Sequence, residues 1–254
     1  MAKLEIPQSF VTRQECDKVA FQNGFRRAHD EADGWRRYSS TTAQGTIWLA
    51  RDDRDTWWLA IDHAGVMAEI EFSPYDVNGP GLVQYQFSAL ASLYAGLSRI
   101  YELAVSLPDA PLQEFIHRTK DLPKTTEAER LVIQRVGQGI FRERLMNYWQ
   151  RRCPITGISD PELLRASHIK PWRVCHSDSE RLDVHNGLLL SALWDAAFDK
   201  GLVTFGDNGM PIYSSSLSDV AKAALKGSMS VSGLSLTQLH QAKMSWHRRN
   251  IFTP

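Results

Sequence analysis

A proline-rich break between residues 108 and 125 constrains this chain more than any other feature. Pro108 and Pro111 are followed by the run Asp121-Leu122-Pro123-Lys124, with a helix-like pattern on either side. Proline lacks a backbone donor and ends regular elements, so the break predicts a linker. A chain of 254 residues is long enough for one large domain or two modest ones, and the break favours two. We therefore expect one domain over residues 1–122 and another over 123–254.

The first part predicts an α+β domain. Residues 13–29 have a helix-like pattern, and three apolar runs at 46–51, 56–63 and 66–72 predict a β-meander. The sequence Asn78-Gly79-Pro80-Gly81 predicts a break. From Phe87 to about Ala104, apolar residues recur at three-to-four spacing, which predicts a long amphipathic helix.

Aromatic residues gather on the predicted meander. Trp48, Trp57 and Trp58 lie on its strands, with Trp35 and Tyr38 nearby. Aromatic rings of this kind can stack on a flipped or modified base. Side chains that alternate in direction along a strand more often pack into the core on one face of the sheet and under a covering element on the other. This structural interpretation of the aromatic residues is favoured over base stacking.

The second part begins with a helix signal. Thr126 and Glu129 form a capping-box pattern that opens a helix extending to about Tyr148. Gly137 and Gly139 inside it suggest a kink or a close backbone approach. The tail from Leu217 predicts two short helices, the last over 237–251.

Three short pieces between these helices carry the chemistry. An apolar strand ends in His168 before a proline, and Asn186-Gly187 forms a turn that feeds a second apolar strand. A short helix then places Asp195 and Asp199 on one face, about 6 Å apart. Stacked carboxylates repel each other unless a cation lies between them, and hard oxygen ligands favour Mg²⁺ or Mn²⁺. A base beside a Lewis acid suits phosphodiester hydrolysis.

In this order the pieces resemble the HNH endonucleases of the ββα-metal superfamily, and within them a bacterial subgroup with a C-terminal HNH domain. The resemblance covers roughly residues 126–254. It is carried by Gly137-Gln138, Phe141-Arg142, Leu145, Tyr148, Cys153, Thr156-Gly157, His168-Ile169, Pro171-Trp172, the run Asn186-Gly187-Leu188-Leu189-Leu190, the run Phe198-Asp199-Lys200-Gly201-Leu202, and an ending with Trp246-His247-Arg248 and Phe252.

The resemblance implies a ββα-metal domain with flanking helices and a role for each motif residue. His168 would be the general base, and Asn186 would brace the loop that holds it. Asp195 and Asp199 would be the metal ligands, with Asp195 in the place of the motif's final histidine. Ser167 stands where the superfamily often has another metal ligand, so water or a DNA phosphate would supply the third contact.

Basic residues near the motif are candidates for phosphate binding: Lys170, Arg173, Arg142 and Arg144. Each of these side chains could equally be a solvent-exposed charge that contacts no phosphate. Residues 126–254 carry 16 Lys and Arg against 12 Asp and Glu, whereas residues 1–125 carry 13 against 17. A mildly basic half favours phosphate contact, although a shift of this size is weak evidence by itself.

Cysteine usage and hydropathy point to a cytoplasmic protein. Cys16, Cys153 and Cys175 are too few and too widely spaced for a disulfide framework. Thr156 stands where a zinc pair with Cys153 would need a second cysteine, so no structural zinc is expected. The N-terminus has no signal-peptide core, and no apolar run approaches the roughly 20 residues of a membrane span.

The sequence therefore predicts an endonuclease that depends on Mg²⁺ or Mn²⁺ and cuts DNA, most naturally double-stranded. A restriction or defence role fits the family by association. Two alternatives remain: a DNA-binding module with little catalysis, and an effector nuclease gated by a ligand of the N-terminal domain. Two cuts in a duplex with one centre per chain would favour a homodimer.

Overall fold

The protein divides into two compact units, Met1–Ala110 and Pro111–Pro254, in a computed structural model that describes residues 3–75 and 79–254. The division lies one helix before the expected boundary at residue 122. Helix α4 (Ala110–Thr119) belongs to the second unit, where Glu114 forms an ion pair with Arg144.

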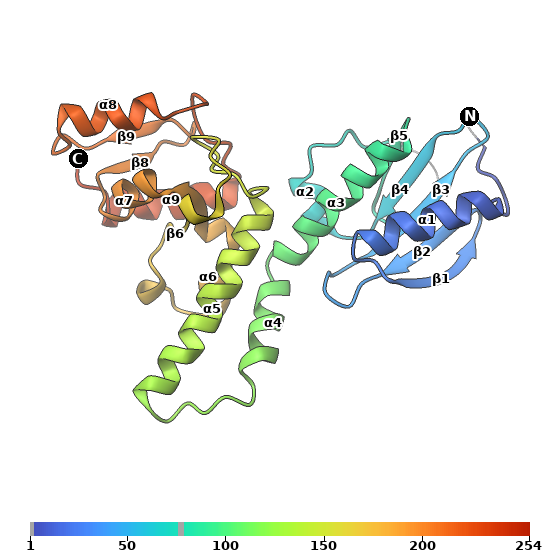
Figure 1. Cartoon of the computed structure of the whole chain (residues 1–254), viewed down its shortest axis with the longest axis horizontal. Helices are drawn as coiled ribbons and strands as arrows, with labels where there is room; N and C mark the ends of the chain where they lie inside the picture. Colours follow the sequence, from blue (N-terminus) through green and yellow to red (C-terminus); the bar gives the residue numbers. More distant parts are fainter. Residues whose placement is uncertain (1–2, 76–78) are drawn as a thin grey trace. The chain divides into compact units, whose positions relative to one another are not determined.

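The first unit is a five-stranded antiparallel sheet in which every strand pairs with the next one in the sequence (Figure 1). Its elements are α1 (Phe10–Gln22), β1 (Arg27–Ala32), β2 (Trp35–Ser39), β3 (Thr46–Arg51), β4 (Trp57–Ile61), α2 (Ala64–Glu69), β5 (Val83–Phe87) and α3 (Leu90–Ser106). The predicted α+β class is confirmed, as are the first two strands of the predicted meander, which are β3 and β4. The long helix is also present, and it begins at Leu90 because Phe87 ends β5.

The predicted strand at 66–72 is wrong, because the chain there forms the short helix α2. The His63 side chain caps it by accepting a hydrogen bond from Val66 N at 3.2 Å. Val66 alone is buried in this helix, so the segment lacks the alternating buried face that a sheet strand needs.

The predicted helix at 13–29 ends early, and its last residues belong to the sheet. Gly24 adopts a φ of +82°, a conformation that terminates the helix, and β1 begins at Arg27. Of the predicted break at 78–81, Asn78 lies outside the described residues, and Gly81 adopts a φ of +75°.

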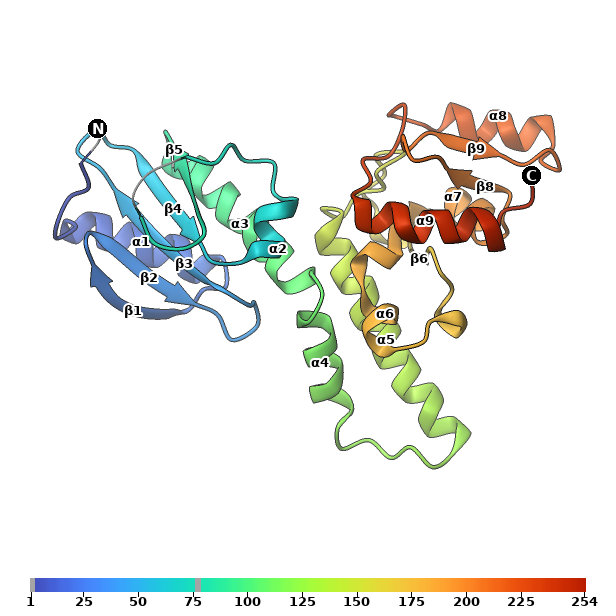
Figure 2. The ribbon, with the colours of Figure 1, turned by 180° about the vertical axis from the view of Figure 1, so that it is seen from behind.

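The two faces of this sheet differ. Tyr38, Ile47 and Ile61 are register partners on the face covered by α1 and α3, and the Tyr38 hydroxyl donates to Asp17 of α1 at 2.7 Å. Figure 2 shows the opposite face in front of these helices. There the register aligns Arg37, Trp48 and Ala60 across three strands.

The second unit places two paired strands and a helix against a long helix. Its further elements are α5 (Glu127–Tyr148), β6 (Leu164–His168), α6 (Asp178–Leu182), β7 (Gly187–Ser191), α7 (Ala192–Asp199), β8 (Val203–Phe205), β9 (Pro211–Tyr213), α8 (Asp219–Gly227) and α9 (Gln238–Asn250), with short 3-10 helices at Pro161–Leu163, Trp172–Val174 and Val184–Asn186. The predicted capping box of α5 is confirmed, as are the two helices of the tail.

The core of this unit lies around β6, β7 and α7. Trp194 and Phe198 of α7 are fully buried and pack with the leucines of β7 and with Phe205 of β8. Burying two large aromatic side chains fixes α7 on the strand pair, because each contributes roughly 1.5–3 kcal/mol of hydrophobic stabilisation. None of the helices in the described parts of the chain is both long and apolar enough to cross a membrane.

Candidate active site

His168 occupies the last position of β6 and faces a glycine on the neighbouring strand. Strands β6 and β7 are antiparallel, with His168 opposite Gly187. A Cβ atom on Gly187 would lie 2.5 Å from Phe141 Cζ, which is closer than real contacts allow. Glycine at this position therefore lets α5 approach the strand pair, and Phe141 stacks on the imidazole with ring centroids 3.8 Å apart.

A backbone carbonyl fixes the tautomer of His168. The Nε2 atom lies 2.9 Å from the carbonyl oxygen of Arg181, and because a carbonyl can only accept, Nε2 carries the proton. Nδ1 is then the unprotonated nitrogen and can accept a proton. Burial lowers the pKa of His168 to about 4, so the imidazole is neutral at pH 7.

Asn186 holds the loop that follows His168. Its side-chain oxygen accepts from Lys170 N at 2.9 Å, and its amide donates to Lys170 O at 3.1 Å and to Glu180 O at 3.2 Å. The side chain is fully buried. These bonds join the loop after β6 to the residues before β7, so Asn186 acts on the backbone.

Two carboxylates lie on α7 close to the end of β6. Asp195 is half-buried and Asp199 is exposed, one helical turn apart. The Ser167 hydroxyl, on the residue before His168, donates a hydrogen bond to Asp195 Oδ1. This bond joins the residue beside the histidine directly to the carboxylate pair.

The pKa of Asp195 is raised, mainly by burial. The neighbouring Asp199 carboxylate raises the pKa further, whereas the Ser167 hydrogen bond and the charge of Arg165 lower it. A carboxylate in this setting is more stable as an anion when a cation is close by.

The segment that holds these residues matches a known family. Residues 153–206, which include β6, β7, α7 and β8, match the family model described as HNH endonuclease. The C-terminal unit contains an HNH domain. No protein with a curated description matches the chain. The HNH domain indicates nuclease activity and a nucleic-acid substrate.

The four basic residues considered for phosphate binding lie in different environments. Three of them bond to the protein itself. Arg142 donates to the carbonyls of Leu164 and Pro161 at 2.8 and 2.7 Å, Arg144 pairs with Glu114, and Lys170 pairs with Glu180 at 2.8 Å. Arg173 is exposed, and within residues 3–75 and 79–254 its side chain has no hydrogen bond or ion pair.

The donors near the HNH strands suit a hard divalent ion. Asp195, Asp199 and the Ser167 hydroxyl all offer oxygen, and Mg²⁺ is commonly bound by one or two carboxylates together with water and phosphate oxygens. Within the described residues, no three His, Cys, Asp or Glu side chains form a group that could hold a metal ion. Cys153 and Cys175 are free and buried.

Several residues that shape the site were not assigned a role from the sequence. The Arg181 carbonyl orients His168, a role for which a backbone atom leaves no sequence signal. Arg165 lies two residues before Ser167 on β6, so strand alternation could have placed it on the same face. His247 stacks on Phe198 with ring centroids 4.0 Å apart and donates from Nε2 to the Phe198 carbonyl at 3.3 Å. It thereby holds the C-terminal turn of α7.

Proposed function

We propose that this protein is a divalent-metal-dependent endonuclease that hydrolyses phosphodiester bonds of DNA at His168, Asp195 and Asp199. The observation that carries the proposal is the pairing of two features on adjacent residues. His168 donates a hydrogen bond from Nε2 to the Arg181 carbonyl, and the Ser167 hydroxyl donates one to the Asp195 carboxylate. The strand that ends in the candidate base is thus bonded to the helix that carries the candidate ion ligands, and hydrolysis needs both kinds of group.

The chain's own groups support a hydrolysis in which His168 is the general base. Nδ1 takes a proton from a water molecule, and the water oxygen forms a bond to phosphorus while the bond from phosphorus to the 3′ oxygen breaks. The products are a 5′-phosphate and a 3′-hydroxyl, which receives a proton from solvent. Phe141 and the Arg181 carbonyl hold the imidazole plane in place throughout.

Asp195 and Asp199 are the residues that would hold the ion. When bound, a Mg²⁺ or Mn²⁺ ion supplies Lewis-acid stabilisation of the negative charge that develops on the phosphate. Burial is the main cause of the raised pKa of Asp195 and the Asp199 carboxylate adds to it, and a bound cation would offset both effects.

The exposed cations near the site suit a polyanionic substrate. Arg165 is exposed on β6, where its charge lowers the pKa of Asp195 and its guanidinium donates to the carbonyls of Glu162 and Leu164. Arg173 is exposed and follows His168 in the chain. Charges of this kind contact the phosphate backbone irrespective of sequence. They support nucleic-acid binding without indicating a recognition sequence.

A plasmid-cleavage assay tests the proposal. The full chain should convert supercoiled plasmid to nicked or linear DNA in Mg²⁺ or Mn²⁺, and EDTA should stop the reaction. His168→Ala should lower the rate by at least about 10²-fold, the usual scale for loss of a general base. His117→Ala is the matched control, because His117 is exposed on α4 and has no part in the site. Equal rates for His168→Ala and the wild type would remove His168 from the mechanism.

A DNA-binding module without efficient catalysis is the second candidate. It is favoured by the small donor set, two carboxylates and a serine hydroxyl. The same assay separates the two candidates. A wild-type chain that binds DNA in a mobility-shift experiment, but cuts it in neither metal, would support the binding module.

A further inference from the structure

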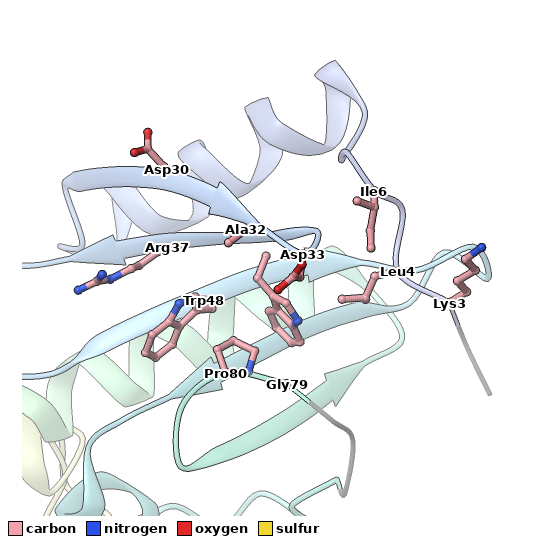
Figure 3. A pocket seen from close by; sticks show the side chains of 11 residues that line it. Lys3, Leu4, Ile6, Asp30, Ala32, Asp33, Arg37, Trp48, Gly79 and Pro80 are labelled. Carbon is pink, nitrogen blue, oxygen red and sulfur yellow. The ribbon is translucent and has the colours of Figure 1, made fainter.

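A pocket of about 820 Å³ lies in the first unit on the face of the sheet opposite α1 and α3. Among the residues that line it are Trp35, Trp48, Arg37 and Asp33, and Figure 3 shows Trp48 and Arg37 among its side chains. Its volume falls in the range of ligand-binding pockets, roughly 300–1,000 Å³.

Strand register explains why this face is hollow. Trp48 is the direct partner of Arg37 on β2 and of Ala60 on β4, so a large ring stands between an arginine and a small residue. Ala50, two residues further along β3, is fully buried and equally small. A Cβ on Gly79 would lie only 3.1 Å from Trp35 Cζ2, so the chain at Gly79 closes one side of the pocket.

The tryptophans on this face are not equally covered. Trp35 and Trp58 are 5% and 4% exposed, and Trp58 donates from Nε1 to Asp52 at 3.0 Å. Trp48, by contrast, is half-buried and lines the open space. A ring held by a rigid sheet, with part of its surface free, can stack on another planar group.

Polar groups at the same pocket complement the edge of a heterocycle. The exposed Arg37 guanidinium makes no hydrogen bond or ion pair with any residue that the structure describes. It offers hydrogen-bond donors, whereas the exposed Asp33 carboxylate offers acceptors. Nucleobases present both ring acceptors and amino or imino donors, so one side of the pocket can stack a base and the other can bond to its edge.

We propose that this pocket binds a nucleobase, stacked on Trp48 and hydrogen-bonded by Arg37. The base comes from one of two sources: a nucleotide flipped out of the DNA that the HNH domain acts on, or a free nucleotide that acts as a ligand of the first unit. The first source rests on the proposed nuclease function, whereas the second does not. Either source gives the first unit a recognition role.

Binding measurements without cleavage test the proposal on the full chain in EDTA. One arm titrates the four deoxynucleoside 5′-monophosphates and 5-methyl-dCMP by calorimetry. The other arm measures fluorescence anisotropy of labelled duplexes that carry either one unpaired base or none. Because neither arm measures catalysis, failure of the nuclease proposal and failure of this one are distinguishable.

Four variants separate the pocket from the rest of the unit. Trp48→Ala and Arg37→Ala remove the stacking ring and the donor, and each should weaken binding about tenfold or more. Trp48→Phe keeps a smaller ring and should retain part of the affinity. Phe10→Ala is the aromatic control, because Phe10 is 73% exposed on α1 and does not line the pocket. Because Arg37 is exposed, Arg37→Ala remains informative even if Trp48→Ala fails to fold.

Each outcome of these measurements either supports the proposed nucleobase site or overturns it. Binding of mononucleotides that Trp48→Ala or Arg37→Ala weakens supports the proposal with a free nucleotide as the source. Tighter binding of the unpaired-base duplex alone, lost in the same variants, supports it with a flipped base as the source. The proposal is overturned if the wild type binds no mononucleotide and does not distinguish the duplexes, or if Arg37→Ala and folded Trp48→Ala bind as tightly as the wild type.

Discussion

The hydroxyl of Ser167 on β6 donates a hydrogen bond to the carboxylate of Asp195 on α7. The two residues are far apart in the chain, yet this bond joins the strand that ends in His168 to the helix that carries both acids. It also lowers the pKa of Asp195, against the effect of burial. Ser167 therefore helps to keep Asp195 ionised, which is the form that binds a metal ion.

Replacing Ser167 should weaken metal binding most at low pH. Ser167→Ala removes the donor, so the pKa of Asp195 should rise and protons should compete better with the ion. We expect about tenfold weaker Mn²⁺ binding at pH 6 and a smaller loss at pH 8, measured by calorimetry. Ser179→Ala, at an exposed serine in α6, is the control. Unchanged or tighter Mn²⁺ binding by Ser167→Ala would show that the hydroxyl does not support the carboxylate.

The two acids of α7 should be required for both metal binding and cleavage. Asp195→Asn and Asp199→Asn each remove one anionic ligand, so each should abolish plasmid cleavage and weaken Mn²⁺ binding. Asp219→Asn, at an exposed acid in α8, should do neither.

A chelator selective for zinc should leave the melting temperature unchanged, since Cys153 and Cys175 are expected to be packed thiols. A drop in melting temperature on zinc removal would contradict that expectation.

The pH profile of cleavage should report the environment of His168. A general base works in its unprotonated form, and the pKa of about 4 keeps His168 unprotonated above pH 5. The acid limb of kcat/KM should therefore lie below the ordinary histidine value of about 6.5. Initial rates between pH 4.5 and 8 at saturating Mg²⁺ measure it. A midpoint at or above pH 6.5 would indicate that another group is the base.

Stability should fall in acid because two histidines are buried in the neutral form. Burial lowers the pKa of both His168 and His247 to about 4. The unfolded chain takes up these protons near pH 6.5, so the stabilisation is complete above that pH and is lost as the pH falls toward 4.

Each of these histidines should account for roughly 1–2 kcal/mol of the decrease in the free energy of unfolding between pH 7 and pH 5. His247→Gln, which cannot titrate, should reduce the pH dependence of urea unfolding by about that amount, whereas the exposed His117→Ala should leave it unchanged. An unaltered pH dependence in His247→Gln would show that His247 is not neutralised by burial.

Two glycine substitutions should act in opposite directions. Gly187→Ala places a Cβ 2.5 Å from Phe141 Cζ, so we expect about 1–3 kcal/mol of destabilisation and slower cleavage as Phe141 moves from His168. Gly139→Ala meets nothing within 4 Å inside α5 and should stabilise the protein by about 1 kcal/mol. Urea unfolding of both variants measures this. Equal stabilities would show that α5 does not need the close approach.

Features that depend on neighbours in the chain were predictable from the sequence. The cap of α5 by Thr126 and Glu129 and the one-turn spacing of Asp195 and Asp199 follow from local geometry. The place of His168 at the end of a strand also followed from the local pattern, an apolar run that stops before a proline. The segment at 66–72 was mispredicted because a run of six or seven residues suits either a helix or a strand until its surroundings are known.

Contacts between distant residues were decided only by the tertiary structure. Local spacing does not show that the Arg181 carbonyl selects the tautomer of His168. Nor does it show that Arg144 is paired with Glu114 while Arg173 stays exposed. The pocket beside Trp48 likewise depends on β2, β3 and β4 meeting in one register. The sequence by itself determined most of the helices and strands and the chemical character of the candidate groups, because these depend on periodicity and side-chain chemistry. Protonation, pairing and exposure depend on which distant groups come within a few ångströms, and only the folded chain determines that.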